Sequence, residues 1–506
     1  MQRVVHTTVR GDNGICKREH GMHSGWSWRQ YISVLLLACA LVIGGLGLSS
    51  SEAAKPYEGT TVKMIVNGEF LKYAMSLIEP ALLETHGIKL EVEVIPGEAF
   101  VTKTLLEFTN GQSPWDLIMF NPSNFADYHR HFEPLDPYIK KLNLKLDLDD
   151  VAKEYRSTNM YWGGTLYAMP LDGDIHIMFY NKVAFERPEN KQRFKEKYGY
   201  DLAPPQTWKQ WDDMAAFFHG WGWDGSDNKL FGAGASYKEN GFSLHWWRSR
   251  FFAYGGQYFD ENMKPLINTK PGIRALEELV KTVDYYPPGV LLFESEEPKT
   301  MLIKGEVPML VSWTSTGKRV GDPNQSLIVD KAGYGVIPGH LVDGKVIRAV
   351  PNTGGRSLAI SKYSKVKDAT AVVLEFISSP EQSLKIDMDS KTLMDPWRNS
   401  HFAAEKFRSA FPGAGEYLDA IKESFTYTVP DPQIPGSDEY RRRLSEAVTK
   451  ALQKSVPPKE ALDQAAEEWD KITKRRGLSK QKEFWKQQAT AMKEAGVTFR
   501  PELADK

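Results

Sequence analysis

Strand-like and helix-like segments alternate over residues 62–120, and this alternation constrains the fold more than any other feature of the chain. The expected strands are Val62–Val66, Leu90–Ile95 and Asp116–Phe120, separated by the expected helices Phe70–His86 and Phe100–Thr109. This order predicts a parallel sheet covered by helices. Open sheets of this kind bind ligands beside the carboxyl ends of their strands. The first candidate residues are therefore Asn67, Glu69 and Asn121, which follow the first and third strands.

The rest of the chain mixes strands and helices and is long enough for more than one domain. At about 100–200 residues per domain, the 506 residues predict two or three domains. Further strand patterns occur at 166–181, 308–313, 334–337 and 358–360. Helical patterns occur at 208–218, with Thr207 as its N-cap, and at 241–254, 272–283, 367–377, 437–452 and 458–472. No short-period repeat is present, which argues against solenoids and propellers.

Charge and cysteine content exclude several classes of function. The formal net charge is −1, so the chain has no basic excess for gripping nucleic acid, and no nucleic-acid partner is expected. Both cysteines, Cys16 and Cys39, lie near the N-terminus. The main body therefore cannot contain a disulfide framework, a cysteine-ligated metal or a cysteine nucleophile.

The N-terminal segment has the order of an export signal. Basic residues precede an apolar run at Tyr31–Leu48, and small residues follow it. Ser51 and Ala53 suit the −3 and −1 positions, so residues 1–53 are predicted to be a signal peptide cleaved after Ala53, with Ala54 as an alternative. Met22 is an alternative start that gives a more ordinary signal length. An uncleaved membrane anchor and a lipoprotein signal ending at Cys39 are the competing interpretations.

A motif search gives no positive support for catalysis. The chain contains no phosphate-binding loop, no H-E-x-x-H and no G-x-S-x-G. Residues 224–228 look like a calcium loop only in part, because the glycine and the final glutamate are misplaced. His129 and His131 are a weak metal hint. No cofactor and no metal are expected.

The order of several short motifs resembles one protein family. The first motif is Gly164–Pro170 with Phe179–Lys182, the second is Pro205–Trp208, and the third is Lys304–Met309 with Ser312 and Trp313; the last are Tyr334–Gly339, Thr353–Ile360 and Ser379–Glu381. Together they resemble the extracellular (periplasmic) solute-binding proteins of ABC importers, in the sugar-binding group that includes maltose-binding protein. The resemblance covers roughly residues 60–475. The family often has tryptophan where Arg356 stands, and the tail after about Ile472 has no obvious counterpart.

The resemblance implies an α/β fold with two lobes (type II-like), each a mainly parallel sheet covered by helices, with the ligand in the cleft between them. The implied boundaries are residues 55–172 and 355–396 for lobe 1, residues 176–350 and 399–475 for lobe 2, and residues 476–506 for a helical tail. It also implies a monomer in the periplasm that captures a sugar or polyol by hinge closure and delivers it to an ABC permease.

Sugars present flat faces for aromatic rings and hydroxyls for carboxylates, amides and guanidinium groups. Candidate ligand-binding residues of these types lie at strand ends and at the implied crossings between lobes: Asn67, Glu69, Asn121, Asp172, Asp174, Trp246, Trp313, Gly354, Gly355, Arg356 and Trp397. Each has an alternative role in a turn, a helix cap or the core. Trp246 and Trp247 face different directions on one helix, so one of them is expected in the core.

Two alternatives to transport remain open at the level of sequence. One is a secreted carbohydrate-active enzyme that uses the same aromatic residues and carboxylates. The other is a solute-binding partner of a membrane sensor. The identity and charge of the ligand are also open, and Arg356 leaves room for an acidic one.

Overall fold

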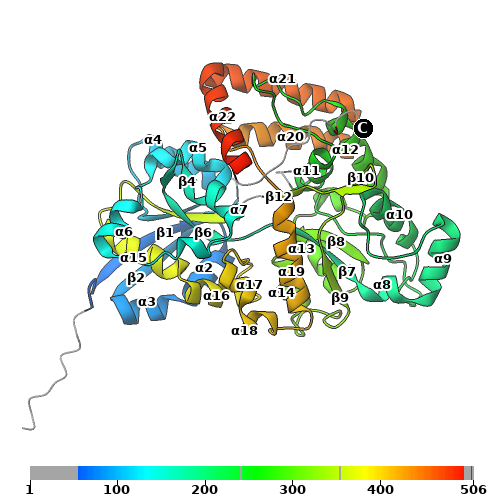
Figure 1. Ribbon diagram of the computed structural model, residues 1–506, viewed down its shortest axis with the longest axis horizontal. Coiled ribbons are helices and arrows are strands. Elements are labelled where there is room, and N and C mark those ends of the chain that lie inside the picture. The colour runs from blue at the N-terminus through cyan, green and yellow to red at the C-terminus, as the bar shows by residue number, and fades with distance from the viewer. Residues whose placement is uncertain (1–54, 98, 240–241, 353–354, 495–502, 504–506) are drawn as a thin grey trace, which may run out of the picture. The chain divides into compact units, whose positions relative to one another are not determined.

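The computed structural model describes residues 55–97, 99–239, 242–352, 355–494 and 503, and contains two main sheets. The predicted signal peptide lies outside these residues. Figure 1 shows β1, β2 and β6 in one group of elements and β7, β8 and β9 in another. The first sheet has the order β2 (Ile88–Val94), β1 (Thr60–Val66), β3 (Leu117–Phe120), β13 (Arg356–Ile360), β6 (Ala168–Asp172). The second has the order β8 (Met309–Trp313), β7 (His176–Asn181), β9 (Ala332–Gly335).

The first sheet is mainly parallel, as predicted. β1 pairs in parallel with β2 and β3, and Val62, Met64, Ile65 and Val66 are fully buried on it. β13 runs antiparallel to both β3 and β6, so it is the one reversed strand among these five. The second sheet differs from the prediction, because β7 pairs antiparallel with both β8 and β9. A long, mostly helical segment separates β7 from β8 in the chain, and a segment of that length can return a strand in either direction.

The remaining strands form two-stranded pairs: β4 (Tyr161–Trp162) with β5 (Thr165–Leu166), β10 (His340–Val342) with β11 (Lys345–Ile347), and β12 (Val350–Asn352) with β14 (Thr428–Pro430). The longer helices are α2 (Glu69–Ser76), α3 (Glu79–His86), α4 (Ala99–Thr109), α9 (Pro188–Tyr198), α10 (Trp208–Phe218), α11 (Leu244–Ala253), α12 (Lys270–Thr282), α13 (Glu296–Ile303), α15 (Lys367–Ser378), α16 (Pro380–Met388), α19 (Ala414–Ser424), α20 (Ser437–Leu452), α21 (Pro458–Arg476) and α22 (Leu478–Glu494). Shorter helices are α5 (Phe125–Tyr128), α6 (Asp136–Leu142), α7 (Lys153–Tyr155), α8 (Lys182–Glu186), α14 (Thr316–Val320), α17 (Asn399–Ala403) and α18 (Glu405–Arg408).

Local sequence explains where several helices begin and end. Thr207 caps α10 and forms a reciprocal capping box with Gln210, as its position before the helix predicted. The single helix expected over Phe70–His86 is instead two helices, α2 and α3. Pro80 lies in the first turn of α3, and proline is tolerated there but not in a helix interior, so it starts a new helix.

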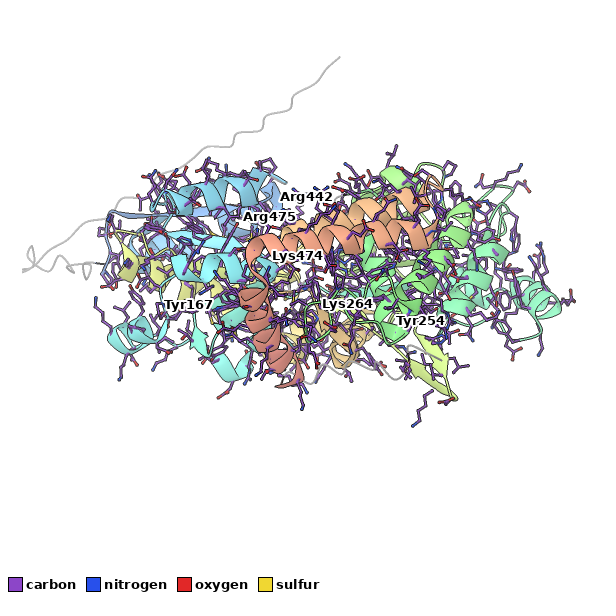
Figure 2. All side chains as sticks on the ribbon, turned by 90° about the horizontal axis from the view of Figure 1, so that it is seen from above. Tyr167, Tyr254, Lys264, Arg442, Lys474 and Arg475 are labelled. Atoms are coloured by element: carbon purple, nitrogen blue, oxygen red, sulfur yellow. The ribbon has the colours of Figure 1, made fainter. Side chains whose placement is uncertain are left out.

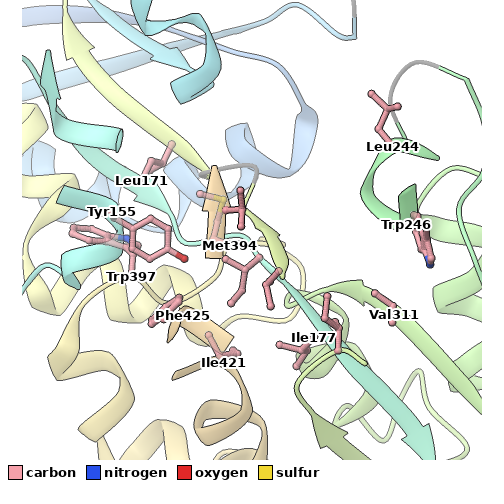
Figure 3. Packing of buried hydrophobic residues seen from close by; sticks show 14 of the residues in the cluster. Tyr155, Leu171, Ile177, Leu244, Trp246, Val311, Met394, Trp397, Ile421 and Phe425 are labelled. Carbon is pink, nitrogen blue, oxygen red and sulfur yellow. The ribbon is translucent and has the colours of Figure 1, made fainter. Parts of the chain in front are cut away.

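Helices α15 and α19 pack on different sheets. α15 contacts β1, β6 and β13 of the first sheet, whereas α19 contacts β7 and β9 of the second. The chain therefore passes between the sheets from β6 to β7, from β9 to β13, and again between α15 and α19. Buried aromatic residues fill part of the core near these passages, and Figure 3 shows Tyr155 beside Phe425, with their ring centroids 5.4 Å apart. Among the described residues, no helix has both the length and the apolar character that crossing a membrane requires.

Candidate functional site

The candidate site is a cavity of about 320 Å³ at the strand ends that the topology brings together. Asn67 and Asn121 follow β1 and β3, and Arg356 begins the antiparallel β13, so all three lie at one edge of the first sheet. Trp313 ends β8 and pairs directly with His176, the first residue of β7. Residues near the two sheets thus line one cavity, as expected for strand carboxyl ends.

Most of the lining is polar. The cavity is lined by Asn67, Phe70, Asn121, Ser123, Asp174, Phe242, His245, Arg248, Ser295, Lys299, Trp313, Ser315, Gly355, Arg356, Leu393, Asp431, Asp438 and Arg441. The lining combines amide, hydroxyl, carboxylate and cationic side chains with a few aromatic rings. Such a lining suits a small molecule with many hydroxyl groups better than an apolar one.

Six of the candidates from the sequence line this cavity: Asn67, Asn121, Asp174, Trp313, Gly355 and Arg356. Gly354 lies outside the described residues. Glu69, the first residue of α2, lines a separate surface depression with Lys63, Lys72 and Glu91, whereas the next residue, Phe70, lines the cavity.

Three candidates are packed inside the protein instead of lining the cavity. Trp246 is 1% exposed and lies behind Trp313, with ring centroids 6.4 Å apart. Trp397 is completely buried, and its ring lies 5.8 Å from that of His401. Asp172 is also completely buried, beneath Arg356. Trp247, the alternative to Trp246, donates a hydrogen bond to the carbonyl of Gly272 in the core.

Arg356 reaches the cavity but is already paired. Its guanidinium donates a hydrogen bond to the buried carboxylate of Asp172, and it lies over the ring of Phe70 at 5.0 Å. Asp172 also accepts a hydrogen bond of 2.9 Å from the backbone amide of Asp395. Because the pair is close to neutral, Arg356 does not hold a positive charge in reserve for an acidic ligand.

The other cations of the lining are paired as well. Arg248 forms an ion pair with Asp431. Arg441 and Asp438 lie 3.3 Å apart on α20, and Lys299 lies 3.3 Å from Glu296 on α13. The four cations of the lining therefore each have an acidic neighbour, and Glu296 is shared between Lys299 and Arg319.

Asp174 differs from these carboxylates. The structure shows no ion pair for it within the described residues, and its Oδ1 is buried without a hydrogen-bond partner there. Burial raises the pKa of Asp174 well above its usual range, and the carboxylates of Asp172 and Asp395 raise it further. A ligand that donates hydrogen bonds to this carboxyl would favour its ionised form.

The cavity wall around Trp313 is mainly aromatic, and the Nζ of Lys299 lies 5.9 Å from the centroid of its ring. Its ring meets His176, His245 and Phe242 edge to face, with centroids 4.6, 5.0 and 5.7 Å away. Burial lowers the pKa of His176 to about 3 and that of His245 well below its usual value, so both imidazoles are neutral. Trp313 keeps 9% of its surface exposed, which leaves part of the indole for a ligand.

Several polar atoms at the cavity have no partner among the described residues. They are Oδ1 of Asn67, Oδ1 of Asp174 and Nε of Arg356. A buried polar atom without a hydrogen bond costs about 1–3 kcal/mol. Two acceptors and one donor in the same cavity match the mixed donor and acceptor character of a hydroxyl.

Several lining residues were not among the candidates from the sequence, notably Phe70, Arg248, Lys299, Asp431 and Arg441. Phe70 follows the first strand end by a few residues and could have been included on that ground. Asp431 and Arg441 come from a segment more than 300 residues away from Asn67, and no local pattern marks them.

The segments that pass between the two sheets pack against one another beside the cavity. Gly173 donates its amide to the carbonyl of Asp395 at 2.9 Å, and a Cβ on Gly173 would lie 2.3 Å from the carbonyl oxygen of Pro396. Gly355 has φ +60°, and a Cβ there would lie 1.9 Å from the carbonyl oxygen of Asp172. Only glycine fits these two places without moving the backbone.

His129 and His131, whose spacing weakly suggested a metal site, contact other groups of the protein. His129 lies 3.1 Å from the carbonyl oxygens of Phe125 and Ala126, and His131 stacks on Phe108 with centroids 4.6 Å apart. Within the part of the chain that the structure describes, no cluster of three or more histidine, cysteine or acidic residues could hold a metal ion.

Comparison with known families decides what kind of protein this is. Residues 67–383 match the family described as bacterial extracellular solute-binding protein. The chain belongs to this family. The resemblance found in the sequence is confirmed, and membership in the family does not favour the alternative of a secreted enzyme.

Curated relatives of this solute-binding protein are distant. A probable amino-acid ABC transporter periplasmic-binding protein of Sinorhizobium fredii is 24% identical over 346 residues, or 66% of this chain and 72% of the relative. A mannitol-binding protein of Pseudomonas aeruginosa is also 24% identical, over 54% of this chain and 59% of the relative.

Known structures confirm the fold of this solute-binding protein. A ribitol complex from Agrobacterium radiobacter has a TM-score of 0.69 and 20% identity, covering 83% of this chain and 100% of that one. A maltose-bound protein of T. maritima has a TM-score of 0.67 and 20% identity, covering 82% and 100%. A D-mannitol complex from Agrobacterium vitis has a TM-score of 0.66 and 19% identity, covering 83% and 99%. These matches establish the two-lobed, mixed α/β fold.

Proposed function

We propose that this protein is the exported substrate-binding subunit of an ABC importer, and that its cavity holds a small sugar or polyol. The observation that carries the proposal is the set of atoms without partners, Asn67 Oδ1, Asp174 Oδ1 and Arg356 Nε, beside the partly exposed Trp313. Hydroxyl groups would complete the hydrogen bonds, and a sugar or polyol carbon face would cover the indole.

The paired charges support a ligand without net charge. Each cation of the lining has an acidic neighbour, so an anionic ligand would bring a further negative charge close to a carboxylate of the protein. The relatives and structures named for mannitol, ribitol and maltose are consistent with this ligand class.

The transport role has further parts. Residues 1–53 would be the export signal, and the mature protein would act in the periplasm as a monomer. The two sheets would belong to two lobes with the boundaries inferred from the sequence, and the glycine-lined passages at Gly173 and Gly355 would form the hinge. Closure would trap the solute unchanged for delivery to a membrane permease.

Titration calorimetry and thermal unfolding with separate ligand classes test this proposal. The panel is ribitol, D-mannitol, maltose, an acidic sugar such as gluconate, and an amino acid, since the S. fredii relative is named for amino acids. A ligand at 100 times its dissociation constant should stabilise the protein by roughly 2.7 kcal/mol.

We expect neutral polyols or sugars to bind and the acidic sugar to bind more weakly. Tight binding of gluconate or of the amino acid alone would contradict the ligand class. Recovery of the ligand unchanged after incubation distinguishes a binding protein from an enzyme.

A further inference from the structure

The C-terminal helix α22 lies beyond the part of the chain that resembled the family. It follows α21 after Gly477, and its side chains contact distant segments on both sides. Lys482 donates a hydrogen bond of 3.0 Å to the side-chain oxygen of Asn262, and Phe484 lies 5.8 Å from the ring of Trp162. Figure 2 shows this helix leaving α21 beyond Lys474, between Tyr167 on one side and Lys264 on the other.

Two buried glutamines of α22 hold one loop of the cavity wall. Gln488 donates a hydrogen bond of 2.7 Å to the carbonyl of Asp431 and accepts one of 2.8 Å from the amide of Gln433. Gln481 donates one of 2.9 Å to the carbonyl of Pro435. The exposed fractions of Gln481 and Gln488 are 1% and 6%. The helix thus fixes both ends of the loop formed by residues 431–436.

This loop connects the cavity to the first group of elements. The carboxylate of Asp431 lines the cavity and pairs with Arg248. The side chain of Gln433 donates a hydrogen bond of 2.7 Å to the carbonyl of Thr158, and the amide of Gly436 donates one of 2.9 Å to Asp127. A shift of the loop would therefore alter the ion pair between Asp431 and Arg248 at the cavity.

We propose that Gln488 is a positioning residue of the ligand site, which acts through the loop of residues 431–436 and not by touching the ligand. The proposal rests on the cavity being the binding site, as proposed above. Gln488 satisfies the backbone at Asp431 and at Gln433 with one side chain, so it holds the loop in a single arrangement. The cavity then presents Asp431 and Arg248 to the ligand at fixed positions, which reduces the entropy lost on binding.

Hydrogen exchange of the protein without ligand tests the positioning directly. Gln488→Ala should speed exchange of the amides of Gln433, Ile434 and Gly436, because the loop loses both hydrogen bonds to Gln488. Gln487→Ala is the matched control, since Gln487 is an exposed residue of the same type on the same helix, and it should leave the loop unchanged. Unchanged loop exchange in Gln488→Ala would overturn the proposal.

A double-mutant cycle separates positioning from general stability. Gln488→Ala should weaken D-mannitol binding about fivefold, and this loss should shrink in an Asp431→Asn background. Equal losses in both backgrounds would show that Gln488 does not act through Asp431 and would overturn the proposal. If Gln488→Ala does not fold, Gln488→Glu replaces it, because its carboxylate still accepts from Gln433 but cannot donate to the Asp431 carbonyl.

The two proposals fail in different ways. If the native protein does not bind D-mannitol, the ligand is assigned from the calorimetric panel and the cycle is measured with that ligand. Failure of every polyol and sugar would count against the proposed function, whereas the exchange experiment would still decide the role of Gln488.

Discussion

The guanidinium of Arg356 donates a hydrogen bond to the buried carboxylate of Asp172, across the neighbouring strands β13 and β6. Arg356 lines the cavity, and Asp172 lies buried beneath it, beside the passage from the first sheet to the second. The pair joins the ligand site to the inferred hinge, so changes at either residue should affect both binding and stability.

Removing one member of this pair should be costly. Arg356→Ala leaves Asp172 as an uncompensated buried carboxylate, which typically costs about 3–5 kcal/mol of folding free energy. Urea unfolding measures the loss. In the double variant Arg356→Met, Asp172→Asn the unpaired charge is gone, and we expect most of the stability to return. A double variant as unstable as Arg356→Ala would show that the pairing is not the cause.

Asn67 and Glu69 lie two residues apart, and the structure assigns them to different places. Asn67 lines the cavity with a buried Oδ1 that lacks a partner, whereas Glu69 lines another depression. Asn67→Ala should therefore weaken binding of the ligand by about five- to tenfold, the value of one or two hydrogen bonds. Glu69→Gln should leave the affinity unchanged, and calorimetry on both variants provides the comparison. A loss at Glu69 instead would place the ligand outside the cavity.

The indole of Trp313 should contribute to binding through its exposed part. Trp313→Phe retains a ring but loses contact area, and we expect an affinity loss of up to about tenfold, since aromatic contacts contribute roughly 0.5–1.5 kcal/mol beyond burial. Trp397→Phe is the control, because Trp397 is fully buried and does not line the cavity. Thermal unfolding of both variants separates loss of fold from loss of contact. Equal affinities of Trp313→Phe and the native protein would remove this residue from the site.

Asp395 should make stability depend on pH. Burial raises its pKa to about 7, with a further increase from Asp172 and an opposing effect from Lys318. The unfolded chain releases this proton near pH 3.9, so between about pH 4 and pH 7 the folded state binds the extra proton. The free energy of unfolding should therefore fall as the pH rises through this window. Asp395→Asn should flatten the profile by up to about 1.4 kcal/mol per pH unit.

Urea unfolding at several pH values measures this effect. The exposed residue Asp330 supplies the control, and Asp330→Asn should leave the slope of the native profile unchanged. If Asp395→Asn keeps the native slope, another carboxylate with a raised pKa, such as Asp212, must account for the pH dependence.

Glycine at position 355 should be required for the contact between passages. Gly355→Ala would place a Cβ 1.9 Å from the Asp172 carbonyl oxygen and would also strain a backbone with φ +60°. Gly163 has a similar φ of +57° but nothing within 4 Å of the same Cβ. Gly163→Ala should thus cost only the strain, about 1–2 kcal/mol, and Gly355→Ala should cost more and weaken binding. Urea unfolding and calorimetry compare them, and equal costs would refute the steric explanation.

Some of the site could be predicted because it follows from strand ends. Asn67 and Asn121 come directly after apolar strands, and the rule that ligands bind at carboxyl ends applies without knowledge of packing. Trp313 was predicted for the same reason, as the last residue of an apolar strand. The family resemblance predicted the fold for a related reason, since its motifs mark strands and helix starts whose order defines the topology.

Other parts could not be predicted from local patterns. Tryptophan is a residue type expected in a sugar site, but Trp246 and Trp397 are buried in the core and do not line the cavity. From the sequence, Arg356 could have bound an acidic ligand. In the structure the pairing of β13 with β6 places Asp172 beside it, and the two side chains form an ion pair. The antiparallel order of the second sheet was missed because a strand's direction depends on how a long connection returns.

The element types, the α/β class and the strand ends beside the cavity follow from local sequence patterns, since periodicity and capping act between residues close in the chain. The packing of the folded chain sets which cations have acidic neighbours, which tryptophans reach the cavity, and that Gln488 supports the loop bearing Asp431. Those properties depend on contacts between segments hundreds of residues apart, and such contacts leave no periodic trace in either segment alone.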